Sequence, residues 1–246
     1  MRRDVAEGDG DGGSTQAAAP AAGPGGIVTV AGIDFVGDTA GALFWAEERL
    51  LLVADLHLEK GSSFARRGMM LPPYDTAATL ARLDAVIARH APRSVVALGD
   101  SFHDGHGPSR LTAQDQAVLA ALQRGRDWIW ITGNHDPEPS AAVGGMFADC
   151  LAIGPLTFRH LPTGGDGEIA GHLHPVARVS VRGRAIRRRC FAGDGRALVM
   201  PAFGAYAGGL NVRHAAFAAA FVNGFTAHML GARRLYAFAA RHCLPD

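Results

Sequence analysis

Hydrophobic and polar positions in the first half of the chain follow two alternating periods. Short apolar runs predict strands at Ile27–Val30, Phe35–Val36, Ala42–Trp45, Leu50–Ala54, Ser94–Leu98 and Trp128–Ile131. Helical stripes of apolar residues predict helices between the later strands, at Thr76–Arg89 and Thr112–Gln123. Asp75 is placed to cap the first of these helices. This strand–helix alternation favours an α/β domain with a largely parallel, buried sheet.

The second half of the chain has short strands at close spacing instead. The apolar runs predict strands at Leu156–His160, Glu168–Ala170, Ala177–Val181, Ala185–Arg189, Ala197–Met200, Phe225–Leu230 and Arg234–Phe238, with a helix at Arg213–Phe221. Arg182-Gly183 stands where a hairpin turn is expected. A half rich in βαβ units followed by a meander-like half predicts two sheets packed together.

The first 26 residues have no hydrophobic period and are mainly Gly, Ala, Pro and short polar residues. They predict a disordered tail, which leaves 27–246 as one folded domain. No apolar run in the chain reaches the ~18–20 residues that a membrane span needs. Acidic residues follow Arg2 and Arg3 where an export signal would be apolar. We therefore expect a cytoplasmic protein that does not bind membranes.

Composition excludes several other classes. The chain has 246 residues, of which 48% are hydrophobic, which is enough for a sizeable core and excludes a wholly disordered protein. Its three cysteines lie far apart and form no C-x-x-C motif, which excludes a disulfide framework and a thiolate zinc site. The formal net charge is +1, and Lys60 is the only lysine. All other cationic side chains are arginines, whose planar forks suit phosphate groups.

Polar residues follow each of the three buried strands of the first half. Leu50–Ala54 leads into Asp55-Leu56-His57, the next strand into Gly99-Asp100, and the third into Gly133-Asn134-His135-Asp136. Binding sites of α/β sheets form at the carboxyl ends of strands, so these side chains are expected to meet. His160 and Gly171-His172-Leu173-His174 lie beside later predicted strands. The ordered set is far less common by chance than any one of its pieces.

These residues form a donor set of two aspartates, one asparagine and four histidines, with no thiolate. In Asp55-x-His57 and His172-x-His174, an extended chain would project both side chains to the same side. Oxygen and imidazole ligands suit Mn²⁺, Fe or Zn²⁺. Seven groups exceed the needs of one ion and fit two ions that share a bridging carboxylate. We therefore expect two divalent metal ions, with Mn²⁺ first and Fe or Zn²⁺ as alternatives.

The same ordered motifs resemble the signature blocks of the calcineurin-like metallophosphoesterases, over about residues 27–210. The resemblance implies an α/β fold, a sandwich of two mixed β-sheets flanked by helices. It implies that one ion is held by Asp55, His57, Asp100 and His174. The other ion would be held by Asp100, Asn134, His160 and His172, with Asp100 as the bridge.

Three longer segments resemble a narrower group, the bacterial ligase-associated DNA damage response endonucleases. They are Asp55–Gly61, Gly99–Asp104 and Pro201–Leu210. This resemblance implies an endonuclease that hydrolyses DNA phosphodiester bonds in repair, on single-stranded or damaged DNA. It also implies an ATP-dependent DNA ligase, a helicase and an exonuclease-like protein as functional partners. Gly99–His103 is similar to the double-strand-break repair nucleases too, where the histidine at the position of His103 helps to handle nucleic acid.

Three residues are candidates for catalysis beside the metal ligands. The resemblance implies that His135 faces the substrate without binding metal, so it is placed to protonate the leaving alkoxide. General acid catalysis of this kind is worth ~10²–10⁴-fold. Asp136 could orient His135, although it could equally be a plain turn residue. His103 is the third candidate, through contact with the nucleic acid.

Two groups of arginines are candidates for binding a phosphate backbone. Arg66 and Arg67 follow the first ligand motif, and Arg187, Arg188 and Arg189 lie in a stretch without acidic residues from Pro175 to Gly193. The alternative for the second group is an ordinary solvated hairpin. An alternative substrate is a small nucleotide or other phosphate ester, which would need the same metal ligands. A non-catalytic scaffold is a third possibility, but such relatives typically lose ligands that are all present here.

Overall fold

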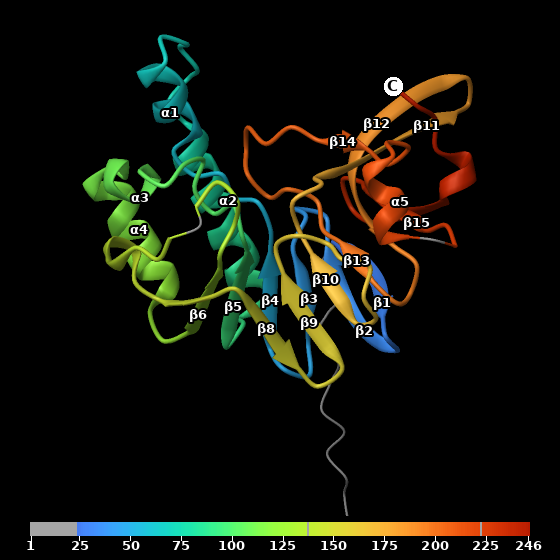
Figure 1. Cartoon of the computed structure of the whole chain (residues 1–246), viewed down its shortest axis with the longest axis horizontal. Coiled ribbons are helices and arrows are strands. Elements are labelled where there is room, and N and C mark those ends of the chain that lie inside the picture. The colour runs from blue at the N-terminus through green and yellow to red at the C-terminus, as the bar shows by residue number, and fades with distance from the viewer. Residues whose placement is uncertain (1–23, 137, 222) are drawn as a thin grey trace, which may run out of the picture.

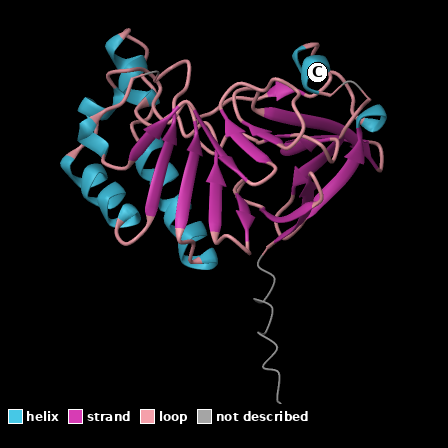
Figure 2. Cartoon of the chain, turned by 60° about the horizontal axis from the view of Figure 1, so that its bottom comes forward, coloured by secondary structure: helices cyan, strands magenta, loops and turns pink. Residues whose placement is uncertain are grey.

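The protein is described from a computed structural model, which covers residues 24–136, 138–221 and 223–246. The tail expected over 1–26 lies outside these residues as far as residue 23. Gly25 and Gly26, the last two residues of the predicted tail, belong instead to the first strand, β1 (Gly25–Val30). Two mixed β-sheets pack against each other, and helices lie along the outer side of the first sheet (Figures 1 and 2). The predicted fold class is confirmed.

The first sheet has seven strands in chain order from β1 to β7. After β1 come β2 (Ile33–Asp38), β3 (Leu43–Trp45), β4 (Leu50–Val53), β5 (Ser94–Leu98), β6 (Asp127–Ile131) and β7 (Met146–Ala148). The pairs from β1 to β4 are antiparallel, and those from β4 to β7 are parallel. The carboxyl ends of β4, β5 and β6 therefore open onto the same edge.

Helices connect the parallel strands, as the apolar stripes predict. They are α1 (Lys60–Arg66), α2 (Asp75–His90), α3 (Gly107–Arg110) and α4 (Ala113–Gln123). The longer two, α2 and α4, are the predicted helices. Tyr74 is the residue that precedes α2, and Asp75 begins the helix rather than capping it. No helix in the described part of the chain is long and apolar enough to cross a membrane.

The second sheet is built from the predicted meander. Its main strands run in the order β14–β11–β12–β13–β10–β9–β8, and β15 and β16 pair beside β12. Their bounds are β8 (Cys150–Ile153), β9 (Leu156–Arg159), β10 (Glu168–Ala170), β11 (Pro175–Val181), β12 (Arg184–Gly193), β13 (Leu198–Val199), β14 (Leu210–Asn211), β15 (Thr226–Leu230) and β16 (Leu235–Ala239). The predicted helix in this half is shorter, α5 (Ala216–Ala220).

The alternation of side chains along β4 shows how the layers are held together. Leu51 and Val53 face the helices and pack with Leu83 and other residues of that cluster. Leu50 and Leu52 face the second sheet and pack in a separate cluster with residues such as Phe158. Because β4 is buried on both sides, its strand end is rigidly placed.

Candidate active site

Both sheets contribute side chains to one site at the strand ends. Asp55 follows β4, Asp100 follows β5, and Asn134 follows β6. His160 follows β9 in the second sheet, and His172 and His174 lie between β10 and β11. All seven residues that the sequence places in the donor set come from these loops. Their side chains form two groups.

The backbone of these loops is left-handed at five of the seven residues. The φ angles are 53° at Asp55, 43° at His57, 46° at Asp100, 69° at His172 and 45° at His174. The side chains of the D-x-H and H-x-H motifs do converge, but an extended chain with a two-residue period is not the reason. The left-handed backbone brings them together. A left-handed residue that is not glycine costs roughly 1–2 kcal/mol. Strain of this kind persists where a site needs a particular geometry.

Hydrogen bonds between the first two loops hold this strained backbone in place. The amide of Asp55 donates to Gly99 O at 3.2 Å, and that of His57 donates to Asp100 O at 2.9 Å. Gly99 itself has a φ of 74°, and a Cβ there would collide with the imidazole of His160. The glycine is thus needed both for its conformation and for the close approach of a ligand side chain.

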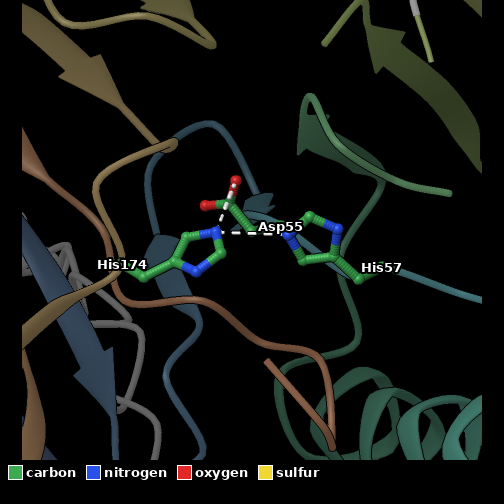
Figure 3. Close-up of side chains that lie close together, drawn as sticks. All are labelled: Asp55, His57 and His174. Atoms are coloured by element: carbon green, nitrogen blue, oxygen red, sulfur yellow. Dashed lines mark hydrogen bonds and ion pairs between the residues drawn. The ribbon is translucent and has the colours of Figure 1, made fainter. Parts of the chain in front are cut away.

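The first group consists of Asp55, His57 and His174, which point toward one another in Figure 3. The Nε2 atoms of His57 and His174 are 3.2 Å apart. Nε2 of His174 is also 3.2 Å from Oδ1 of Asp55. The donor atoms of this group lie within 4.8 Å of one another, as they would around a single ion.

The second group consists of Asp100, His160 and His172, with Asn134 against it. Nε2 of His160 lies 2.9 Å from Asn134 Oδ1, 3.2 Å from His172 Nδ1 and 3.4 Å from Asp100 Oδ1. The other oxygen of Asp100, Oδ2, is 3.9 Å from His57 Nε2 in the first group. Asp100 therefore stands between the two groups, with one oxygen toward each.

The chemistry of these atoms fits a divalent cation. His160 Nδ1 is 3.0 Å from the carbonyl of Leu98, which can only accept, so Nδ1 carries the proton. In neutral His160, Nε2 is then an acceptor that faces the acceptor oxygens of Asn134 and Asp100. A metal ion resolves this convergence of lone pairs, and the Leu98 carbonyl fixes the tautomer that binds it.

Burial and charge favour the metal-binding form at Asp100 and His57, but not at His160. Burial opposes ionisation of Asp100, but hydrogen bonding to His160 and nearby charge hold the pKa of Asp100 below its usual value. Burial and the neighbouring His174 lower the pKa of His57. Burial lowers the pKa of His160 as well, but Asp100 and Asp55 outweigh it and raise that pKa. A carboxylate and a neutral imidazole are the ligand forms.

His135 lies over the site with its ring open to solvent. Its amide donates to Asp100 Oδ1 at 2.9 Å, and its Nδ1 lies 3.0 Å from the carbonyl of His103. Since that carbonyl can only accept, Nδ1 donates, and Nε2 points toward Asp100 Oδ2 at 3.9 Å. The rings of His135 and His103 stack, with centroids 5.3 Å apart.

Asp136, for which the sequence left open an orienting role or a plain turn, contacts the loop after β5. Its Oδ2 accepts a hydrogen bond from the amide of Phe102 at 3.0 Å, and its Oδ1 is buried without a partner among the described residues. Burial, opposed by the Phe102 amide and aided by the charge of Asp100, raises the pKa of Asp136 to about 7. The carboxyl group instead ties the loop after β6 to the loop after β5, and the carbonyl of His103 orients the imidazole.

The family model of calcineurin-like phosphoesterases matches residues 48–183. The chain belongs to this family. It is therefore a metal-dependent phosphoesterase, and the two donor groups agree with the two divalent metals that the family uses. A comparison with curated proteins finds no match. Among solved structures, nuclease MPE of Pseudomonas putida is similar, with a TM-score of 0.66 and 26% identity over 87% of this chain and 99% of that chain.

Only some of the arginines that the sequence offers for phosphate binding are exposed and unpaired among the described residues. Arg66 and Arg67 are exposed at the end of α1. Arg188 is exposed on β12, whereas Arg187 pairs with Asp246 at 3.1 Å. Arg189 is half-buried and donates to the carbonyl of Ala202 at 2.7 Å. Burial, aided by repulsion from Arg82, lowers the pKa of Arg189 to about 10. Arg189 is thus held within the fold, unlike a residue on a free phosphate-binding face.

Sequence reasoning gave no role at the site to Lys60, which begins α1 next to the first ligand loop. A usable signal was present, since this is the chain's only lysine and directly follows Asp55–Glu59. The loop of residues 203–209, which belongs to the Pro201–Leu210 motif, also borders the site through hydrogen bonds to Ala54 and Asp55. Its Tyr206 carbonyl accepts a hydrogen bond from Lys60.

Proposed function

We propose that this phosphoesterase is a dinuclear phosphodiesterase that hydrolyses DNA, with Mn²⁺ as its metal. The observation that carries the proposal is the position of Asp100 between two groups of donor atoms. A carboxylate shared in this way suits two ions that act on one phosphate. Nuclease MPE, a similar structure, is a nuclease by name, which supports a phosphodiester substrate.

In this proposal each donor group holds one ion. Asp55, His57 and His174 hold the first ion, and Asp100 is a ligand of both ions. Asn134, His160 and His172 complete the second. When bound, the two cations polarise the phosphoryl oxygens and make a water molecule acidic enough to attack phosphorus at neutral pH.

The chain's own contribution to bond cleavage is the proton for the leaving oxygen. Nδ1 of His135 donates to the carbonyl of His103, so in the imidazolium form Nε2 carries the second proton and can deliver it toward the site. The leaving group of a DNA diester is a poor alkoxide, so this proton matters more for DNA than for activated esters. His103 stacks against His135 and lines the approach to the site, where it would contact the nucleic acid.

Charge around the site supports DNA over a small ester. Arg66 and Arg67 are exposed beyond the first ligand loop, and Arg188 is exposed on β12, so each is available for a backbone phosphate. Arg187, the neighbour of Arg188 on β12, shares its charge with Asp246. We place the enzyme in DNA repair on single-stranded or damaged DNA. By resemblance, its partners there are an ATP-dependent ligase, a helicase and an exonuclease-like protein.

The test is hydrolysis of linear and circular single-stranded DNA with Mn²⁺, compared with short phosphate esters. We expect the wild type to cleave both DNA forms, because an endonuclease needs no free end. Asp100→Ala should be inactive, whereas Asp84→Ala, an exposed aspartate on α2, should match the wild type. Cleavage of the small esters alone would overturn the DNA substrate and favour a nucleotide phosphoesterase.

A further inference from the structure

Lys60 brings a cation to the edge of the metal-binding groups. It is the first residue of α1 and is half-buried. Its ammonium group donates to the carbonyl of Tyr206 at 3.1 Å and lies 5.8 Å from the centre of the Phe64 ring. An ammonium has three N–H donors. Only this one side-chain hydrogen bond is formed within the described residues, so two donors have no protein partner there.

Glu59, the neighbour of Lys60 in sequence, and Asp75, whose charge acts on Lys60, are engaged elsewhere. Glu59 accepts hydrogen bonds from the hydroxyl groups of Thr76 at 2.9 Å and Ser62 at 2.6 Å. Asp75 accepts from the amide of Gly61 at 3.0 Å. No ion pair joins Lys60 to a carboxylate in the part of the chain that the structure describes. Burial lowers the pKa of Lys60 and the charge of Asp75 partly restores it, as expected for a cation without a close counter-ion.

Aromatic rings connect Lys60 to the catalytic histidines. The ring of Phe64 lies 5.4 Å from that of His103, and His103 stacks on His135. Burial and then the charge of Lys60 lower the pKa of His103 to about 4. Lys60, Phe64, His103 and Tyr206 therefore border the site on the side of His135, outside both donor groups.

The loop that carries Tyr206 is fixed to the first ligand loop. The amide of Phe203 donates to Ala54 O at 2.8 Å, and the amide of Gly204 donates to Asp55 O at 3.1 Å. A Cβ at position 204 would collide with the carbonyl of Leu56. These bonds fix the loop that carries the Tyr206 carbonyl relative to Asp55. The carbonyl in turn positions Lys60 relative to the metal-binding residues. This gives the Pro201–Leu210 motif a physical role.

We propose that Lys60 binds a non-bridging oxygen of the phosphate next to the scissile phosphate, on the side of the leaving oxygen. This assignment rests on the proposed function. The scissile phosphate has the metal-binding groups as its partners. Lys60 belongs to neither group and lies next to the ring of Phe64, which adjoins that of His103. A half-buried cation with free donors and no carboxylate partner gains most from an anionic ligand. Its ligand is therefore a substrate with at least two phosphates, such as a nucleic acid strand.

The test compares Lys60→Met and Lys60→Arg on two substrates. Bis(4-nitrophenyl) phosphate has one phosphate, and a short single-stranded oligonucleotide has several. Loss of one charge-assisted hydrogen bond should raise the KM for the oligonucleotide about 10-fold, with little change in kcat. The loss on the nitrophenyl ester should be less than about 2-fold. Lys60→Arg should recover most of the KM, since it keeps the charge. Equal losses on both substrates would overturn the assignment.

Binding by the metal-free protein gives a second readout. Fluorescence anisotropy with the oligonucleotide should show that Lys60→Met lowers the slope of log affinity against log salt by ~0.7, the value for one lost phosphate contact. Arg124→Met removes an exposed cation at the end of α4 and should leave the KM and the slope unchanged. An unchanged slope in Lys60→Met would also overturn the assignment. Failure of the wild type to cleave DNA would instead count against the proposed function.

Discussion

The strand-end site and the arginine hairpin differ in how sequence relates to chemistry. The seven residues of the donor set come from distant segments; six form two groups, and Asn134 lies against the second. The arginines of the β11–β12 hairpin are close together in sequence, but the fold separates them. Arg178 donates to Pro245 O, Arg187 pairs with Asp246, and Arg189 is held by Ala202.

The difference shows what each kind of pattern encodes. Residues at the ends of neighbouring buried strands share an edge whatever lies between them, so their spacing predicts a site. A run of charge gives the number of cations but not their partners, because the partners come from distant segments. We therefore expect substitution of Lys60, next to the donor set, to weaken DNA binding more than substitution of any one arginine of the hairpin.

The largest effect is expected at His135, inside the strand-end site. His135→Ala should keep both metal ions, since His135 belongs to neither donor group. Its rate should fall by ~10²–10⁴-fold on diesters with poor leaving groups, because they need a proton on the leaving oxygen. Activated nitrophenyl diesters should lose far less. Steady-state kinetics on both types of ester test this, and an equal loss on both would show that His135 is not the acid.

An intermediate effect is expected at Arg189, and it concerns folding. Arg189→Ala removes the donor to the Ala202 carbonyl and should lower the free energy of unfolding by about 1–3 kcal/mol. Arg188→Ala, one residue away and exposed, should change it by less than about 0.5 kcal/mol. Denaturant unfolding of both variants measures the difference. Equal stability of the two would mean that Arg189 is as free as its neighbour.

The smallest effect is expected at Asp246, which accepts hydrogen bonds from Arg187 and Asn211. If the hairpin contacts DNA, Asp246→Ala frees Arg187 for a phosphate. DNA affinity should then rise about 2-fold, and its salt slope should steepen by up to ~0.7. Asp166→Ala removes an exposed carboxylate that pairs with Arg196 and serves as the matched control. Unchanged binding in Asp246→Ala would make the hairpin a solvated edge.

Much of the fold could be predicted from the sequence because hydrophobic periods report burial. The strands around β4–β6 and the helices α2 and α4 follow from apolar runs and stripes. The short helix α1 was missed, since Lys60–Arg66 contains no apolar stripe and is held by contacts with α2 and α3. The edge strand β7 has only three residues and gives no signal of its own.

The candidate site could be predicted as a set of residues, but not its geometry. The left-handed backbone at Asp55 and His57 follows from hydrogen bonds to the loop after β5, which no local pattern encodes. The contact of Asp136 is set by a distant segment for the same reason, since its partner Phe102 lies 34 positions earlier. Tertiary hydrogen bonds decide both outcomes.

The central claim is that Asp100 joins two metal sites, and a count of bound metal tests it most directly. Elemental analysis of the manganese-loaded wild type should find about two ions per chain. Asp100→Ala should lower the occupancy of both sites, and Asp84→Ala should keep both. Fewer than two strongly bound ions in the wild type, or two in Asp100→Ala, would contradict the account.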